Sequence, residues 1–219
     1  MSIPLYFAIC EQEYSAAERF PFAQCGFGFH EDGSPRLPER IVPNALCVID
    51  DAVLPPVGLL TAQSVDALAA CCSGGCVFDF EREEAAAHRF IVQLAASLPR
   101  SARIVLPVRY RHLLPDATPI VSCPAPVNRW QAFLAQTQKN TAAWMLELVP
   151  WAQTYRFCCA LQADRLLPQA MAHCNVQGNE VRYRETAQTI QERVTQAEAY
   201  GCIGVIGLYS ELKPFFSEV

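Results

Sequence analysis

The chain has 219 residues, of which 52% are hydrophobic and 18% are charged, and its formal net charge is −5. This composition excludes a disordered chain and predicts one globular domain, residues 1–219, with a sizeable core. An acidic chain with so few lysines (Lys139 and Lys213) is a poor partner for nucleic acid. No apolar run approaches the ~20 residues that span a bilayer, so we expect no membrane partner either.

The eleven cysteines lie mostly inside apolar segments, as Cys10, Cys47, Cys123 and Cys202 do. Their number is odd, and their spacing includes no paired C-x-x-C motifs of the kind that bind zinc. We therefore expect reduced, buried thiols in a cytoplasmic protein, with no metal and no cofactor. The N-terminus has no basic segment before a long apolar one, so it predicts a strand and not a signal peptide.

Apolar runs alternate with helical patterns along most of the chain. The runs predict strands at Leu5–Cys10, Ala45–Ile49, Cys76–Phe80, Arg103–Val108, Pro119–Cys123, Trp144–Val149 and Cys202–Leu208. The helical patterns cover Thr61–Cys72, Glu83–Leu98, Asn128–Gln138 and Thr186–Tyr200. This alternation predicts an α/β fold, either a (β/α)8 TIM-barrel-like fold or a doubly wound parallel sheet.

Two segments depart from this alternation. Residues 20–44 are rich in Phe, Gly and Pro and predict a hairpin or a long loop. The eighth strand that a barrel needs is expected there, which would make the N-terminal third irregular. Residues 172–184 predict a β-hairpin with a short turn at Gly178-Asn179.

Two carboxylates, Asp79 and Glu81, stand at the end of the strand predicted over Cys76–Phe80. Side chains alternate between the two faces of a strand, so these carboxylates should project from the same face. The strand lies between two helical segments, which indicates a parallel sheet. Parallel α/β folds carry their chemistry at the carboxyl ends of the strands, so the pair is the first candidate site.

The run Gly-Gly-Cys-Val-Phe-Asp-Phe-Glu, residues 74–81, resembles the strand-four signature D-x-x-D-x-D-x-E of glycoside hydrolase family 18, the chitinase-like TIM barrels. The C-terminal third is similar to that family in the order of its elements. It has a hairpin ending at Val181-Arg182-Tyr183, a helix opened by Thr186, and a strand beginning at Gly201-Cys202. The resemblance covers residues 61–212 and implies the (β/α)8 TIM-barrel-like fold.

The resemblance also implies a glycoside hydrolase acting on N-acetylglucosamine-containing glycans, either chitin-like or derived from peptidoglycan. In this family the acetamido group of the substrate assists the reaction, so one acid and one orienting aspartate can suffice. By position, Glu81 would be the general acid, and Asp79 would orient the acetamido group. Repulsion between the two carboxylates would separate their pKa values and leave Glu81 as the proton donor at neutral pH.

The sequence departs from the family pattern at several positions. The first two aspartates of the signature fall on Gly74 and Val77, and the Tyr-Asp pair of the family's sixth strand is absent from residues 120–126. A retained acid in a reduced motif leaves two hypotheses open. The chain is either an active glycosidase or a catalytically inactive barrel, a pseudoenzyme, that binds a glycan or a protein partner.

Two further interpretations of the acid pair stay open at the level of the sequence. In an unrelated barrel, Asp79 and Glu81 would bind a hard cation such as Mg²⁺, together with Asp50 or Glu147. Alternatively, the two carboxylates form structural ion pairs with a nearby arginine, for example Arg109.

Other residues near predicted strand ends are candidates for binding an oligosaccharide. Glu11 and Asp50 follow strands, and Glu147 lies in an apolar strand where a carboxylate needs a partner or a pocket. Aromatic side chains offer faces on which sugar rings can stack. The aromatic candidates are Tyr110, Tyr209 and Trp151, of which Trp151 is preferred because it follows Pro150 just past a strand end.

Overall fold

The computed structural model describes residues 3–14, 21–56, 58–122, 130–150, 152–156, 173–177 and 180–216. The chain forms two compact units. The N-terminal unit contains residues 5–121, and the C-terminal unit contains residues 122–219 together with residues 1–4. Trp151, Cys123 and the turn predicted at Gly178-Asn179 lie outside the described residues. That residues 1–219 form a single domain stays a prediction.

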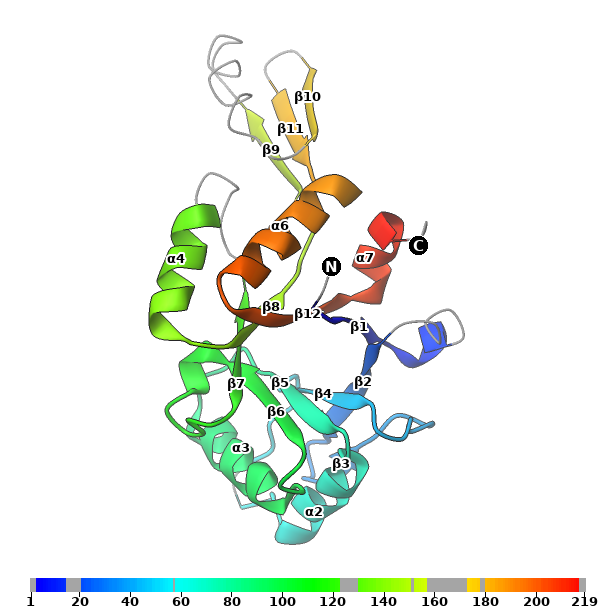
Figure 1. The fold of residues 1–219 in the computed structure, drawn as a ribbon. Helices are drawn as coiled ribbons and strands as arrows, with labels where there is room; N and C mark the ends of the chain where they lie inside the picture. The colour runs from blue at the N-terminus through cyan, green and yellow to red at the C-terminus, as the bar shows by residue number, and fades with distance from the viewer. Residues whose placement is uncertain are drawn as a thin grey trace. The chain divides into compact units, whose positions relative to one another are not determined.

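The N-terminal unit contains a sheet of parallel strands in the order β1-β2-β4-β5-β6-β7 (Figure 1). The bounds are Leu5–Ile9 (β1), Phe22–Phe29 (β2), Leu46–Asp50 (β4), Gly75–Asp79 (β5), Arg103–Pro107 (β6) and Thr118–Ser122 (β7). Each of these strands pairs with the parallel strand that comes before it in the chain. Such an order is typical of a sheet built from successive β-α units.

Two helices, α2 (Ala62–Cys71) and α3 (Ala85–Ser97), pack against one face of this sheet. The side chain of Thr61 caps α2 by accepting a hydrogen bond from the backbone amide of Ser64 at 3.1 Å. The apolar core between the helices and the sheet includes Phe78 of β5 and Phe90 of α3. The opposite face of the sheet is called the inner face below.

The N-terminal third is irregular, as the sequence predicts. The eighth strand expected within residues 20–44 is β2, and its pairing with β4 shifts in register between Gln24 and Phe27. Gly26, inside this shift, has a φ of +101°, which L-residues with a side chain rarely adopt. Residues 30–45 connect β2 to β4. They contain a short antiparallel strand, β3 (Pro35–Arg36), and they form no helix.

The C-terminal unit pairs β8 (Trp144–Glu147) in parallel with β12 (Cys202–Leu208). Among its described residues, the helices are α4 (Trp130–Asn140), α6 (Ala187–Ala199) and α7 (Tyr209–Phe216). A three-stranded antiparallel sheet has the order β10-β11-β9, with the bounds Ala152–Arg156 (β9), His173–Gln177 (β10) and Glu180–Arg184 (β11). The β10–β11 hairpin confirms the expectation for residues 172–184, whereas β9 and α7 were not predicted.

The alternation of parallel strands and helices confirms an α/β fold of the (β/α)8 TIM-barrel-like class. The helices α2, α3, α4 and α6 begin and end within about two residues of the predicted positions, which is the usual uncertainty of helix ends. Two short 3-10 helices, η1 (Glu11–Glu13) and η2 (Val108–Tyr110), follow β1 and β6. Within the described ranges, no helix combines the length and the hydropathy needed to cross a membrane.

Candidate active site

The acid pair lies at the carboxyl end of β5, and both of its side chains are exposed. Phe78 and Phe80 alternate with them and are buried against α3. This alternation continues past Asp79, the last residue of β5, and places Asp79 and Glu81 on the inner face. The exposure of both carboxylates, with Phe80 buried between them, agrees with the expected common direction.

The backbone around Glu81 is fixed by a buried carboxylate from the neighbouring strand. Asp51 follows β4 directly and is 5% exposed. Its Oδ2 accepts hydrogen bonds from the backbone amides of Glu81 at 2.9 Å and Arg82 at 2.7 Å. Hydrogen bonds to a carboxylate are stronger than neutral ones, so Asp51 holds the segment that carries Glu81.

The same segment is held from its other side by η2. Nη1 of Arg109 donates a hydrogen bond to the backbone carbonyl of Glu81 at 3.1 Å. The hydroxyl of Tyr110 donates to the backbone carbonyl of Arg82. Residues following β4 and β6 thus fix both peptide groups next to Glu81, and the carboxylate of Glu81 extends from a supported backbone.

The carboxylate of Glu81 forms no ion pair with any residue that the structure describes. Arg109 binds the carbonyl of Glu81 and not its side chain, and across the described part of the chain no arginine forms a salt bridge with Glu81. The interpretation of this residue as a structural ion-pair partner of Arg109 therefore has no support. An exposed, supported carboxylate can exchange a proton with a bound molecule.

Asp50 lies beside Asp79, because the two residues are opposite each other in the register of β4 and β5. Arg36 of β3 forms a salt bridge with Asp50, with 2.5 Å between Nη2 and Oδ2. A Cβ atom at Gly28 would lie 2.7 Å from the same Nη2, so the glycine leaves room for the guanidinium group. Arg36 therefore compensates one of the two charges at this strand end, a role that the sequence did not suggest.

Two cysteines stand next to these carboxylates. Cys10 follows β1 and Cys25 lies in β2, one position beyond the paired residues Ile9 and Gln24. Burial raises the pKa of Cys25 to about 12, and the thiol of Cys10 and the charges of Asp79 and Asp50 contribute in the same direction. Cys25 therefore stays protonated at neutral pH and is not a nucleophile of this site.

Tyr110 has a different position from the one expected for a sugar-stacking residue. Its ring is completely buried in the core of the N-terminal unit, where it packs against Phe80 and His88. The 3-10 helix η2 that follows β6 directs the side chain into the core between the sheet and the helices α2 and α3, so no ring face is exposed to a sugar. Burial also raises the pKa of its hydroxyl, which stays protonated and donates to Arg82.

The remaining candidates lie in other parts of the chain. Glu11, in η1, is exposed, and its Oε1 accepts a hydrogen bond from the backbone amide of Arg40 at 3.2 Å. Glu147 ends β8, and its Oε2 accepts a hydrogen bond from the hydroxyl of Ser122, the residue of β7 with which the C-terminal unit begins. Tyr209 is the first residue of α7 in that unit. Of the candidates, Asp50, Asp79 and Glu81 lie together, at the neighbouring carboxyl ends of β4 and β5.

The positions of the two missing aspartates are occupied by structural features. Val77 lies in a row of valines on the inner face, between Val48 of β4 and Val105 of β6. A Cβ atom at Gly74 would lie 2.3 Å from the backbone carbonyl oxygen of Asn44, so no side chain fits there. The packing around β5 therefore leaves no room for a side chain at Gly74 and surrounds Val77 with apolar neighbours, at the two positions where the family signature has aspartates.

The described residues include no group of three His, Cys, Asp or Glu side chains arranged to hold a metal ion. The cluster of Asp50, Asp79 and Glu81 thus differs from a cation site, in which several oxygen ligands surround the ion. Asp50 is instead paired with Arg36. The magnesium interpretation gains no support from this arrangement.

Solved structures with the same fold come from chitinases and a spore enzyme. The C-terminal domain of a putative chitinase from Desulfitobacterium hafniense has a TM-score of 0.61 at 12% identity, over 99% of this chain and 98% of that chain. The spore cortex-lytic enzyme SleL from Bacillus cereus has a TM-score of 0.58 at 11% identity, over 94% and 70%. The family GH18 chitinase from Cycas revoluta has a TM-score of 0.55 at 11% identity, over 94% of each chain.

The chain has the fold of the family 18 chitinases. This likeness confirms, at the level of the fold, the resemblance carried by residues 74–81. No protein-family model matches the sequence, and no curated protein matches it either. The Cycas revoluta chitinase has been solved in complex with allosamidin, and a double mutant of it in complex with (GlcNAc)4.

Proposed function

We propose that the chain is a glycoside hydrolase acting on N-acetylglucosamine-containing glycans, with Glu81 as its general acid. The observation that carries the proposal is the exposed carboxylate of Glu81 at the carboxyl end of β5, on a backbone held by Asp51, Arg109 and Tyr110. Acid catalysis requires a proton donor fixed within hydrogen-bond reach of the glycosidic oxygen. A supported segment meets this requirement better than a free loop.

The proposed reaction has two steps. In the first, Glu81 donates its proton to the glycosidic oxygen, the bond from that oxygen to C1 breaks, and the acetamido oxygen of the substrate bonds to C1. In the second, water attacks C1, the acetamido oxygen leaves, and the proton released by the water returns to Glu81. The configuration at C1 is retained because the substrate itself is the nucleophile.

Asp79 is assigned the orienting role. Its carboxylate, on the same face as Glu81, would accept a hydrogen bond from the acetamido N–H and so hold the acetamido oxygen near C1. The salt bridge of Arg36 with Asp50 reduces the negative charge beside Asp79. The other proposed sugar contacts are Glu11, Glu147, Tyr209 and Trp151.

The substrate class follows from the chemistry and from the relatives by fold. Assistance by the substrate requires an acetamido group at C2, which chitin and peptidoglycan glycans both carry. One relative by fold is a cortex-lytic enzyme and another has been solved with (GlcNAc)4. Chitin-like and peptidoglycan-derived oligosaccharides are therefore the proposed substrates.

A second candidate function is glycan binding without hydrolysis. It is favoured by the positions of the two missing aspartates, where Val77 is packed between valines and Gly74 has no room for a side chain. In this alternative the strand end binds a sugar but Glu81 transfers no proton.

The test is the turnover of chitooligosaccharides and muropeptide fragments by the wild type, Glu81→Gln and Asp79→Asn. We expect each variant to lose turnover by about 10²–10⁴-fold, the usual contribution of a positioned acid or base. Glu83→Gln is the matched control, because Glu83 is exposed two residues further along the same segment. Turnover that survives in Glu81→Gln would refute the assignment of the acid.

Binding of the same sugars to the wild type separates the two candidates. Binding without turnover, unchanged in Glu81→Gln, would support the non-hydrolytic function. Neither binding nor turnover would refute both and would direct attention to a protein partner.

A further inference from the structure

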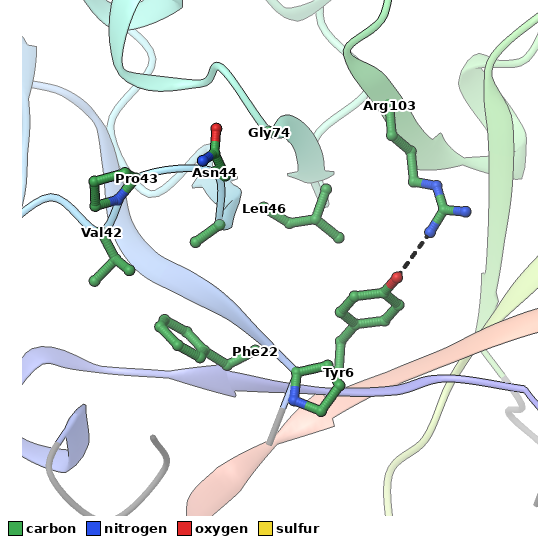
Figure 2. A pocket seen from close by; sticks show the side chains of 10 residues that line it. Tyr6, Phe22, Val42, Pro43, Asn44, Leu46, Gly74 and Arg103 are labelled. Carbon is green, nitrogen blue, oxygen red and sulfur yellow. Dashed lines mark hydrogen bonds between the residues drawn. The ribbon is translucent and has the colours of Figure 1, made fainter. Parts of the chain in front are cut away.

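A pocket lies at the end of the N-terminal unit opposite to the acid pair. It is formed at the amino-terminal ends of β1, β2, β4, β5 and β6 and has a volume of about 460 Å³. Tyr6, Phe22, Leu46 and Arg103 lie at the starts of four of these strands, and Gly74 precedes β5 (Figure 2). Pockets that bind small molecules have volumes of about 300–1,000 Å³.

The walls of the pocket are mostly apolar. Leu46 is buried, and Phe22 and Val42 are half-buried. Figure 2 shows Val42 and Pro43 on one side of the pocket, with Arg103 on the other side. Such walls favour a ligand that has an apolar part, because burial of apolar surface provides the main driving force for binding.

Arg103 gives this apolar pocket a positive charge. Among the described residues that line the pocket it alone is charged, and its Nη1 donates a hydrogen bond to the hydroxyl of Tyr6 at 3.0 Å. No carboxylate in the described ranges forms a salt bridge with Arg103. A guanidinium group has five N–H donors in a planar fork, which matches the two oxygens of a carboxylate.

The hydroxyl of Tyr6 adds a second donor at the same place. Because its oxygen accepts the hydrogen bond from Arg103, its own proton is free to be donated to a bound anion. Arg103 and Tyr6 together therefore present adjacent donors beside an apolar wall. This is a small polar anchor in an apolar cavity, the usual composition of a ligand site.

We propose that this pocket binds a small amphipathic carboxylate. The carboxylate lies on Arg103 and the hydroxyl of Tyr6, and a ring or short hydrocarbon chain packs against Phe22, Leu46 and Val42. The site is distinct from the acid pair, since the five residues of β5 separate Gly74 from the exposed segment that follows Asp79. At about 3.3 Å per residue, this places the two sites about 16 Å apart along the strand.

The test is calorimetric titration of the full chain with benzoate, cyclohexanecarboxylate and hexanoate, with benzamide and inorganic phosphate as comparison ligands. We expect saturable binding of at least one carboxylate, at least about tenfold stronger than that of benzamide or phosphate, because both the charge and the apolar part are recognised. Equal binding of benzamide would refute the role of the charge. Equal binding of phosphate would refute recognition of the apolar part.

Two variants locate the binding. Arg103→Gln keeps the length of the side chain without its charge and should weaken carboxylate binding at least about tenfold, and Tyr6→Phe should weaken it about threefold. Arg100→Gln, at an exposed arginine outside the pocket, is the matched control and should bind as the wild type does. Unfolding midpoints of the variants verify that they fold.

The proposal is overturned if none of the three carboxylates binds the folded wild type, or if their binding is unchanged in Arg103→Gln. The measurement is independent of glycan turnover, so the proposed hydrolase function and this site can fail separately.

Discussion

The carboxylate of Asp51 accepts a hydrogen bond from the backbone amide of Glu81, across the gap between two neighbouring strand ends. It accepts a second one from Arg82, and it is buried, so neither bond is weakened by competition with bulk water. The position of the proposed acid therefore depends on a residue that is not itself part of the exposed site. Asp51 is a positioning residue.

The first prediction concerns the removal of this carboxylate. Asp51→Ala should lower the free energy of unfolding by about 2 kcal/mol, because two backbone amides lose a charged acceptor. It should also lower kcat/KM for chitooligosaccharides by about 100-fold, since small displacements of a catalytic group are costly. Urea denaturation and initial-rate kinetics measure the two effects.

A control separates the loss of stability from the loss of position. Leu68→Ala removes a fully buried side chain of α2 and should cost about 2–5 kcal/mol, without touching the segment of Glu81. It should keep the turnover of the wild type under conditions where it is folded. If Asp51→Ala retains full kcat/KM, Asp51 has a structural role alone.

The second prediction concerns the reduced signature. Val77→Asp restores a family aspartate, but it buries a charge between Val48 and Val105 and should cost about 3 kcal/mol or more. Turnover should not increase. Val92→Asp, at a valine of α3 that is 45% exposed, is the control and should change the stability by less than about 0.5 kcal/mol. A stable Val77→Asp with higher turnover would contradict this account of the row of valines.

The third prediction concerns a buried ion pair in the C-terminal unit. Nη1 of Arg193 lies 2.7 Å from both carboxylate oxygens of Glu185, and the two residues are 5% and 2% exposed. Glu185→Gln leaves a buried guanidinium group without its counter-charge and should cost about 3–5 kcal/mol.

Replacement of both partners tests the cause of this loss. The double variant Arg193→Met, Glu185→Met should be more stable than Glu185→Gln, because no unpaired charge stays buried. The guanidinium group of Arg193 also lies 5.0 Å from the centre of the Trp130 ring, so some stabilisation is lost in the double variant as well. Denaturation of the wild type, the single variants Arg193→Met and Glu185→Met, and the double variant gives the coupling energy. A double variant as unstable as the sum of both single variants would contradict the prediction.

The sequence predicts the strands and the acid pair well because both depend on local patterns. Buried parallel strands are continuous apolar runs, and the alternation of side chains along β5 follows from backbone geometry alone. Asp79 and Glu81 could therefore be assigned to one face without knowledge of the rest of the fold. Their exposure agrees with that assignment.

The contacts that support the pair could not be predicted in this way. Asp50 and Asp51 are adjacent in the sequence and differ only in the direction of their side chains, yet one binds Arg36 and the other binds a backbone 30 residues further along. Tyr110 follows a strand, as a ligand-binding aromatic residue would, but η2 directs it into the core. The supporting role of Asp51 could have been recognised from the consecutive aspartates Asp50 and Asp51 at the end of β4. Because side chains alternate between the two faces of a strand, only one of the two can point toward the site.

Two elements were missed for different reasons. The strand β9 is partly polar, so it lacks the apolar run that marks a buried strand. The helix α7 contains Pro214, a residue that normally argues against the interior of a helix. The pocket at the amino-terminal ends of the strands was also missed, because its walls come from strand starts and loops that are far apart in the sequence.

The last prediction concerns alkaline pH. The pKa of Cys25 is raised from 9.0 to about 12, mainly by burial, and burial raises that of Cys76 as well. Above pH 9 the unfolded chain loses these thiol protons while the folded chain keeps them, so the folded state binds more protons and its stability falls as the pH rises. The free energy of unfolding falls by at most about 1.4 kcal/mol per pH unit for each thiol, and below pH 9 the effect vanishes.

Urea denaturation under reducing conditions between pH 7 and pH 11 measures this slope. Cys25→Ala should reduce the slope above pH 9, whereas Ser97→Ala should leave it unchanged, and a Cys25→Ala slope equal to that of the wild type would contradict the prediction.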